Sequence, residues 1–198
     1  NGTFSVKEYK KVAIIGGGIG TYPLYELAKE LKGKADVTMY MGFRNKDILF
    51  YEEEMKAVAK NLYVCTDDGS YAFHGNGSQQ LQALVDACNT YDCCVAIGPM
   101  IMMKFTCLLT KKLEIPTIVS MNPIMVDGTG MCGACRLMVD GQVKFACVDG
   151  PEFDGHLVDF DQAMKRQQQY KTEEGRAKLA YEEGATHHGG CGNCGGDK

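Results

Sequence analysis

The sequence predicts an α/β protein with a five-stranded, parallel, doubly wound sheet, followed by a loop, a hairpin and a terminal helix. Three observations lead to this prediction. Short apolar runs alternate with helical patterns up to residue 121, glycine-rich turns follow the first and fourth runs, and the alternation stops after Met121. Strands that alternate with helices are typical of a parallel sheet covered by helices on both faces.

The composition excludes several functional classes. The chain has 198 residues, with 21 basic and 25 acidic side chains, so its net charge is −4. That length suits one large domain with a real core. A mildly acidic chain gives no electrostatic reason to bind nucleic acid, and no apolar run approaches the roughly 18 residues of a membrane span. We therefore expect a cytoplasmic protein that has neither a nucleic-acid nor a membrane partner.

The apolar runs place the elements. We expect strands at residues 11–15, 37–41, 61–65, 93–97 and 117–121. Between them, Pro23 opens a helical pattern that Gly33 closes, residues 47–59 form a plausible helix, Ser78 caps the next one, and residues 100–112 form the last. After residue 121, residues 137–139 and 143–145 flank Asp140-Gly141, a strong signal for a two-residue hairpin. Residues 160–183 are polar and favour a helix.

The turn after the first strand, Gly16 to Pro23, favours a phosphate-binding loop. Glycines let a pyrophosphate approach backbone amides at the start of a helix. The usual dinucleotide pattern G-x-G-x-x-G is absent, because its last position falls on Thr21 or Pro23. No acidic residue ends the second strand either, since Gly42 and Arg44 stand there. A phosphate-binding turn is favoured over a merely tight turn, and the usual Rossmann subtype is disfavoured.

Two more turns belong to the same edge of the predicted sheet. Gly98-Pro99-Met100 follows the fourth strand, and residues 66–70, an acidic turn with Asp67 and Asp68, follow the third. Ligands of open α/β sheets lie along the carboxyl ends of the strands, so these turns and the glycine loop can line one crevice. The alternative for the acidic turn is an ordinary exposed Asx turn.

The cysteines fall into two groups. Five lie in apolar segments and are expected to be small core residues: Cys65, Cys88, Cys93, Cys94 and Cys107. Of the others, three join an aspartate in the pattern Asp127-x4-Cys132-x2-Cys135-x11-Cys147. Plant-type two-iron clusters use C-x4-C-x2-C with a distant fourth cysteine, so Asp127 stands at the first ligand position. The pattern favours an iron–sulfur cluster over the alternative, a structural Cys3Asp zinc site.

The tail holds a separate pattern, His187-His188-x2-Cys191-x2-Cys194. It could chelate a metal, but a glycine-rich terminus of no fixed structure is favoured. No residue is assigned a catalytic role, and His74 and His156 belong to no pattern with other candidate residues.

The glycine loop GGGIG-x-x-P, the strand end GPM-x-MM and the D-x4-C-x2-C-x11-C segment together resemble one family. It is the ferredoxin-reductase-like electron-transfer subunits, which include the small subunit of NADH-dependent ferredoxin:NADP oxidoreductase, also called the FAD/NAD-binding subunit of sulfide dehydrogenase. The electron-transfer subunit of dihydroorotate dehydrogenase B is a relative that usually carries Cys at the position of Asp127. The likeness covers residues 12–154, and Asp127 favours the sulfide dehydrogenase type.

The resemblance implies cofactor roles for matching residues. The positions that would bind NAD(H) or NADP(H) are Gly17, Gly18, Ile19, Gly20, Thr21, Arg44, Asp67, Asp68, Gly98, Pro99, Met100 and Met103. The positions that would hold a 2Fe-2S cluster are Asp127, Cys132, Cys135 and Cys147.

The resemblance also implies a domain organisation and partners. Residues 1–121 would be the NAD(P)-binding domain, 122–156 the 2Fe-2S-binding loop and hairpin, and 157–198 a helix and glycine-rich tail. Family members begin with a β-barrel that binds FAD, and no sequence for it precedes Lys11. We therefore expect FAD only in a longer subunit.

The expected function is electron transfer between NAD(P)H, FAD and the cluster to a larger flavin or iron–sulfur catalytic subunit, or to ferredoxin. The alternatives are a subunit of dihydroorotate dehydrogenase B, of a hydrogenase or of a sulfur reductase. A non-enzymatic alternative is a nucleotide-binding module with structural zinc.

Overall fold

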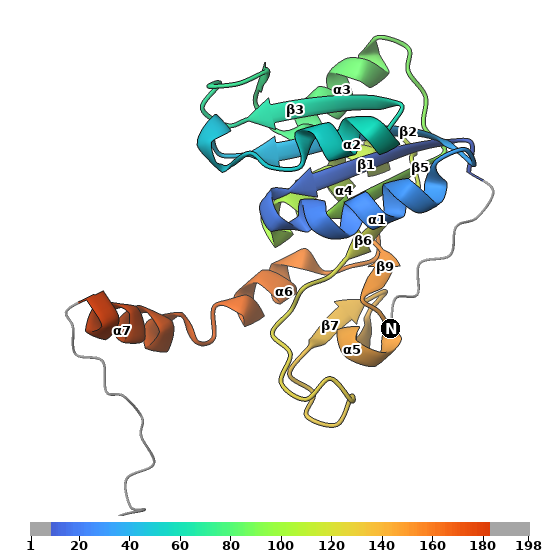
Figure 1. Cartoon of the computed structure of the whole chain (residues 1–198). Helices are drawn as coiled ribbons and strands as arrows, with labels where there is room; N and C mark the ends of the chain where they lie inside the picture. Colours follow the sequence, from blue (N-terminus) through green and yellow to red (C-terminus); the bar gives the residue numbers. More distant parts are fainter. Residues whose placement is uncertain (1–8, 183–198) are drawn as a thin grey trace, which may run out of the picture.

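The computed structural model describes residues 9–182 and contains a seven-stranded main sheet (Figure 1). The order of strands across the sheet is β4-β3-β2-β1-β5-β6-β9. In chain order, its strands are β1 (Lys11–Gly17), β2 (Asp36–Phe43), β3 (Asn61–Thr66), β4 (Phe73–His74), β5 (Cys93–Ile97), β6 (Thr117–Ser120) and β9 (Glu152–Asp154). The five predicted strands are confirmed, and β4 and β9 widen the sheet at its two edges.

The centre of the sheet is β1, which pairs in parallel with both β2 and β5. Val12, for example, lies opposite Val37 on one side and Cys93 on the other. The chain first builds outward from β1 through β2 and β3, and then crosses to the other side of β1 to build β5 and β6. The topological switch point therefore lies between β1 and β5, where ligands of such sheets bind.

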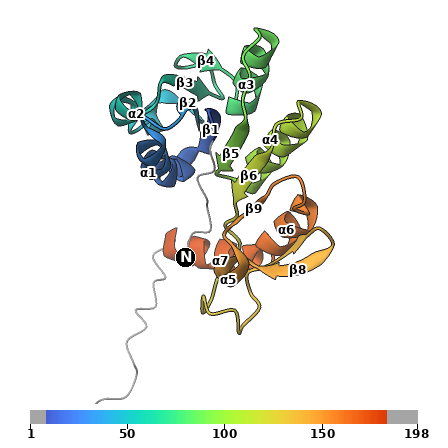
Figure 2. The ribbon, with the colours of Figure 1, turned by 90° about the vertical axis from the view of Figure 1, so that its right-hand side faces the viewer.

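Helices cover both faces of the sheet (Figure 2). One face carries α1 (Thr21–Leu31) and α2 (Glu52–Val58), and the other carries α3 (Gly77–Asp86) and α4 (Met100–Lys112). A hydrophobic core lies on each face of the sheet. Alternate residues of β1 belong to one core or the other, because successive side chains of a strand point to opposite faces. Ile14 packs with the α1 and α2 core, whereas Ile15 packs with the α3 and α4 core.

Three local predictions were wrong in detail. The helix expected at 47–59 is split into a short 3-10 turn, η2 (Lys46–Ile48), and α2, because Tyr51 before α2 adopts φ 62°. The N-cap of α3 is Asn76 rather than Ser78, and its Oδ1 accepts a hydrogen bond of 3.1 Å from the Gln79 amide. Cys88 is exposed rather than part of the core, because it follows the end of α3.

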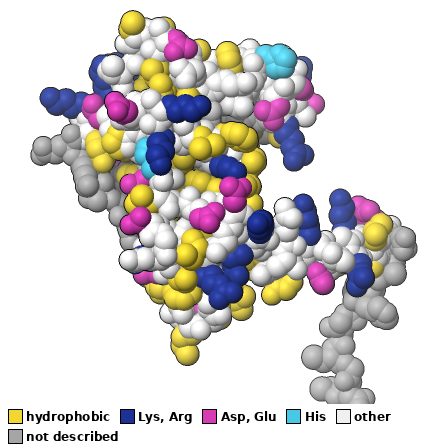
Figure 3. Space-filling model, turned by 180° about the vertical axis from the view of Figure 1, so that it is seen from behind, with side chains coloured by type: hydrophobic (Ala, Val, Ile, Leu, Met, Phe, Trp, Pro, Cys, Tyr) yellow, Lys and Arg dark blue, Asp and Glu magenta, His cyan; other side chains and the backbone are white. Residues whose placement is uncertain are grey.

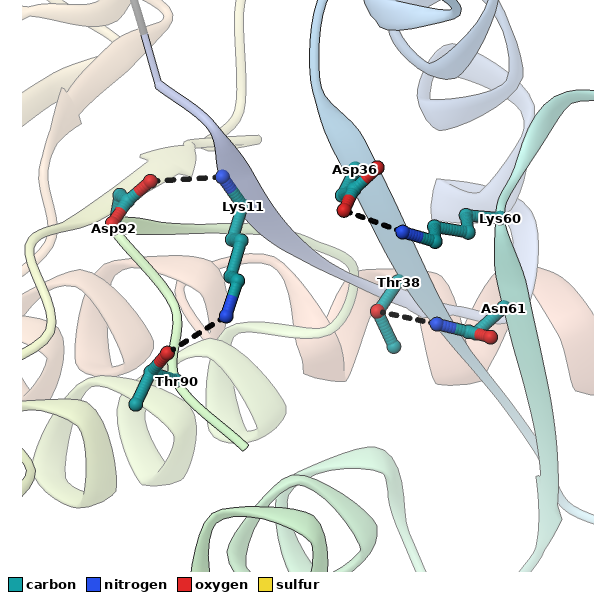
Figure 4. Close-up of polar contacts among 7 residues, drawn as sticks. All are labelled: Lys11, Asp36, Thr38, Lys60, Asn61, Thr90 and Asp92. Carbon is teal, nitrogen blue, oxygen red and sulfur yellow. Dashed lines mark hydrogen bonds and ion pairs between the residues drawn. The ribbon is translucent and has the colours of Figure 1, made fainter. Parts of the chain in front are cut away.

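The amino-terminal end of the sheet is closed by polar contacts (Figure 4). Lys11 donates from its backbone amide to Asp92 at 2.8 Å and from its side chain to Thr90 at 3.1 Å. Lys60 pairs with Asp36 at 2.5 Å across β2 and β3. These contacts join neighbouring strands at the end of the sheet opposite the carboxyl-terminal turns. They therefore stabilise the sheet and have no role in binding a ligand at those turns.

The segment after β6 forms a long loop and a separate hairpin below the main sheet (Figure 1). The hairpin comprises β7 (Arg136–Val139) and β8 (Gln142–Phe145), joined as predicted by Asp140-Gly141, where both residues have positive φ. A single helical turn, α5 (Ala146–Asp149), leads to β9, which returns to the main sheet and pairs antiparallel with β6. The segment that contains Asp127, Cys132, Cys135 and Cys147 is thus anchored to β6 at both of its ends.

Two helices rather than one end the described chain. The first, α6 (Phe160–Gln167), packs on the body through Phe160 and Ala163. The second, α7 (Lys171–Glu182), buries no residue and projects away from the body (Figure 3). The pattern with His187, His188, Cys191 and Cys194 lies outside the described residues. Among residues 9–182, no helix is long and apolar enough to cross a membrane.

Candidate functional site: a groove at the strand ends and a cysteine segment

A groove of about 450 Å³ opens at the carboxyl ends of the parallel strands. Its walls come from the turns after β1, β2, β3 and β5 and from the first turns of α3 and α4. The lining residues are Gly17, Gly18, Gly42, Phe43, Arg44, Ile48, Asp67, Asn76, Gly77, Ser78, Pro99, Ile101, Met102 and Phe105. The groove therefore crosses the topological switch point, as the positions of the turns predict.

The glycine turns after β1 and β5 touch each other in the groove. A Cβ on Gly98 would lie 3.0 Å from the Gly17 nitrogen, and a Cβ on Gly20 would lie 2.8 Å from the Ile97 carbonyl carbon. A side chain at either position would separate the two turns. The glycines thus bring two backbone segments together and leave the floor of the groove without side chains.

The expected nucleotide residues divide into three sets. Five line the groove: Gly17, Gly18, Arg44, Asp67 and Pro99. Gly20, Gly98 and Thr21 support it from below, since Gly20 and Thr21 are buried and Gly98 abuts Gly17. The others lie elsewhere: Ile19 is 81% exposed in the 3-10 turn η1 (Gly18–Gly20), and Asp68, Met100 and Met103 do not line the groove.

The methionine assignment has to be corrected. Met100 and Met103 were expected at the groove, but both are buried in the core that α3 and α4 form against the sheet. Residues three or four apart share one face of a helix, so Met100, Met103 and Cys107 all turn toward the sheet. Met102 lies on the neighbouring face of the helix and lines the groove. Its sulfur atom would lie 2.6 Å from a Cβ added at Gly17.

The start of α3 is a part of the groove that the sequence prediction missed. Asn76, Gly77 and Ser78 all line it. Asn76 caps the helix, while Gln79 reaches back to the Asn76 amide at 3.0 Å and completes a capping box. Asn76-x-x-Gln79 before an apolar pattern is a recognisable helix start. That signal could have placed this helix end at the same edge of the sheet.

The acidic turn after β3 presents one of its two carboxylates to the groove. Asp68 accepts a 2.9 Å hydrogen bond from the Ser70 amide, and hydrogen bonds from Ser70 lower the pKa of Asp68. This contact is the Asx turn considered for the segment. Asp67 instead lines the groove next to Arg44.

In the cysteine segment, Asp127 organises the loop before Cys132. Its carboxylate accepts hydrogen bonds from the Thr129 amide at 2.8 Å and from the Cys132 amide at 3.0 Å. Backbone hydrogen bonding, first from Thr129, lowers the pKa of Asp127, so the group is an anion at neutral pH. Asp127 and Cys132 are both exposed and lie together at the tip of the loop.

Cys135 and Cys147 form the second pair. Their Sγ atoms lie 3.3 Å apart, and Cys135 is buried while Cys147 is half-buried. The contact with Cys135 raises the pKa of the Cys147 thiol. Two thiolates on one tetrahedral metal with bonds of about 2.3 Å lie about 3.8 Å apart. The observed pair is close to that spacing.

The four candidate ligands lie in two pairs along the segment. Within residues 9–182, no three His, Cys, Asp or Glu side chains converge on one point. The four candidates instead form two pairs, Asp127 with Cys132 and Cys135 with Cys147. A cluster with two irons needs two ligands at each iron, so the residues fit a 2Fe-2S group.

A comparison with protein families supports an iron–sulfur function for the cysteine segment. Residues 122–159 match the iron–sulfur cluster binding domain of dihydroorotate dehydrogenase B. The matched region begins just after β6, contains all four candidate ligands and ends after β9.

Comparisons over most of the chain find similarity to electron-transfer subunits of the same enzyme. The chain is 47% identical over 178 residues to a dihydroorotate dehydrogenase B (NAD(+)) electron transfer subunit homolog of Thermotoga maritima, covering 89% of this chain and 61% of that protein. It is 32% identical over 181 residues to a probable electron transfer subunit of the same enzyme from Methanocaldococcus jannaschii, covering 91% and 68%.

A solved structure shares the fold. A chain of the NADH-dependent reduced ferredoxin-NADP oxidoreductase, studied for flavin-based electron bifurcation, matches with a TM-score of 0.82 and 41% sequence identity. The match covers 92% of this chain and 65% of that chain. The present chain thus spans about two thirds of the length of the proteins it matches.

Proposed function

Because the chain belongs to the family of dihydroorotate dehydrogenase B electron-transfer subunits, we propose that it passes electrons between a pyridine nucleotide, a flavin and a 2Fe-2S cluster. An oxidoreductase-type role follows from the family. The nucleotide, the route of the electrons and the partner are the proposed parts.

One structural relationship carries the proposal. The segment with the four candidate ligands leaves the sheet at β6 and returns to it at β9. The neighbour of β6 is β5, whose carboxyl end leads into the Gly98-Pro99 turn of the groove. A nucleotide site and a cluster site are therefore built on adjacent strands of one sheet, which supports electron transfer between them.

The groove residues bind and orient the nucleotide. The bare backbone at Gly17 and Gly18 admits a pyrophosphate to the amides before α1. Met102, Ile101 and Phe105 form an apolar wall on the other side of the groove. No side chain here has to act as a nucleophile, because the bound nucleotide and flavin would supply the redox chemistry.

The cysteine segment holds the cluster through its two pairs. Cys135 and Cys147 would bind one iron, and Asp127 and Cys132 the other. A carboxylate is a harder ligand than a thiolate, and it would tune the reduction potential of the iron it binds. Arg166 of α6 donates to the Ala134 carbonyl at 3.1 Å and so steadies the loop between Cys132 and Cys135.

The partner is a larger flavin or iron–sulfur catalytic subunit, with ferredoxin as the alternative electron acceptor. The exposed position of Asp127 and Cys132 supports this assignment, because it leaves one edge of the cluster segment open to another protein.

The cluster assay tests the proposal directly. Protein purified or reconstituted without oxygen should contain about two irons and two acid-labile sulfides per chain, as the 2Fe-2S formula requires. It should also bind a pyridine nucleotide in calorimetric titrations. Stoichiometric zinc without sulfide would refute the electron-transfer role and favour a structural metal site.

A further inference from the structure

The helix α6 lies between α4 and the segment that carries the candidate cluster ligands. Lys104 of α4 pairs with Asp161 of α6 at 2.6 Å, and Ala163 of α6 is buried in the core. At the start of the helix, the Asp159 amide donates to the Met138 carbonyl of β7 at 2.9 Å. The helix is therefore fixed against both the body of the protein and the β7–β8 hairpin.

Arg166 reaches from this helix to the loop between Cys132 and Cys135. It follows Ala163 by three residues, so the two side chains lie on the same side of the helix. Its guanidinium donates to the Ala134 carbonyl at 3.1 Å in a partly buried contact. A hydrogen bond from a charged donor is roughly twice as strong as one between neutral groups. The contact therefore fixes the peptide that joins Ala134 to Cys135.

The same loop contains hydrogen bonds to the sulfur atoms of candidate ligands. The Ala134 amide donates to Cys132 Sγ at 3.5 Å, and the Cys147 amide donates to Cys135 Sγ at 3.5 Å. Hydrogen bonds to the sulfurs and the net charge around a cluster both set its reduction potential. Arg166 acts on both, because it holds Ala134 in place and adds a positive charge beside the loop.

The charge of Arg166 is not paired with an acidic side chain in the described part of the chain. No ion pair among residues 9–182 includes Arg166, whereas Lys104 is paired with Asp161. Reduction adds one electron to a 2Fe-2S cluster, so a fixed positive charge nearby favours the reduced form.

We propose that Arg166 is a positioning residue of the cluster site. It holds the ligand loop through the Ala134 carbonyl, and its charge raises the reduction potential of the cluster. The inference rests on the proposed function of the cysteine segment. It goes beyond that function, because it assigns control of the potential to a helix that contributes no ligand.

The test is a redox titration of the full chain, reconstituted without oxygen and followed by electron paramagnetic resonance. In Arg166→Gln, the equilibrium constant for reduction should fall about tenfold, equal to about 59 mV for one electron. Arg166→Met, which keeps the apolar stem, should show the same fall. Arg166→Lys keeps the charge and should change the constant by less than about threefold. Lys165→Gln is the matched control, because it removes the same charge from the exposed neighbouring residue.

A second measurement reports on the positioning of the loop. Iron removal by a chelator should be about tenfold faster in Arg166→Gln than in the wild type, because the ligand loop loses its support. The rate for Lys165→Gln should equal that of the wild type.

Each other outcome rejects the inference. Unchanged potentials in Arg166→Gln and Arg166→Met would overturn it, and so would an equal fall in Lys165→Gln, which would reflect the overall charge of α6. A fall in Arg166→Lys as large as that in Arg166→Gln would show that the charge is not the cause. If the wild type takes up no iron and sulfide, the proposed function of the cysteine segment fails and the inference falls with it. A loaded wild type whose potential every variant shares rejects the inference alone.

Discussion

The Sγ atoms of Cys135 and Cys147 lie 3.3 Å apart because the hairpin between them brings its two open ends together. Arg136 pairs with Phe145 at the base of the hairpin, and the Ala146 amide donates to the Cys135 carbonyl at 3.2 Å. The eleven residues between the two cysteines thus correspond to the β7–β8 hairpin and the residue that follows it. Backbone pairing alone thus brings these two candidate metal ligands together.

Replacing one member of that pair should abolish the cluster. In Cys135→Ser, we expect iron and sulfide contents below about one fifth of the wild-type values after identical anaerobic reconstitution, because one iron loses a thiolate ligand. Cys88→Ser is the matched control, since Cys88 is exposed and distant in sequence from the segment. A full iron and sulfide content in Cys135→Ser would remove this residue from the ligand set.

Asp127 should affect both the retention of the cluster and its reduction potential. We expect Asp127→Cys to keep the cluster and to lower its reduction potential, because a thiolate donates more electron density to iron than a carboxylate. Asp127→Ala should lose most of the iron, since it also removes the acceptor of the Thr129 and Cys132 amides. Redox titration followed by electron paramagnetic resonance measures the first effect. Identical potentials in wild type and Asp127→Cys would show that Asp127 does not bind iron.

The two methionines at the start of α4 should separate stability from binding. Met103→Ala should destabilise the fold by about 2–5 kcal/mol, as is usual for a fully buried methionine. Met102→Ala should cost much less stability and weaken nucleotide binding several-fold, because Met102 lines the groove. Urea unfolding and calorimetric titration of both variants check this expectation. The reverse result would mean that α4 is rotated relative to the arrangement described above.

Stability should fall at alkaline pH because of buried thiols. Burial raises the pKa of Cys65 from 9.0 to about 12, and burial with the charge of Asp154 raises that of Cys107 to about 12. The folded form binds these protons more tightly, so the stabilisation is complete below about pH 9 and is lost as the pH rises toward 12. Between pH 8 and 10.5, each thiol should cost about 1–2 kcal/mol of unfolding free energy.

The cysteine contribution can be isolated with Cys65→Ala. Its unfolding free energy, measured in urea at several pH values, should decline less steeply above pH 9 than that of the wild type. Parallel declines would assign the alkaline instability to other groups.

The main strands were predictable because each is a local apolar run bounded by turns. The edge strands were not, since β4 has two residues and β9 has three, and both exist only through pairing with β3 and β6. The split before α2 depends on Tyr51, whose ring contacts Tyr22 and Tyr25 of α1. Such contacts join residues far apart in the chain.

The candidate site was likewise only partly predictable from the sequence. Spacing alone identified the turn after β1, the turn after β5 and the four candidate cluster ligands. It could not decide between Met102 and Met103, because the helical period defines faces but not which face meets the groove. Nor could it separate Asp67 from Asp68, whose different roles depend on the single hydrogen bond from Ser70.

The short strand β9 gives the cluster segment a protective role as well. It covers the outer edge of β6, whose backbone groups would otherwise be an open template for strands of other chains. Substitutions that weaken β9 would uncover this edge and favour association between chains. The segment that holds the candidate ligands therefore also limits pairing of the main sheet with other chains.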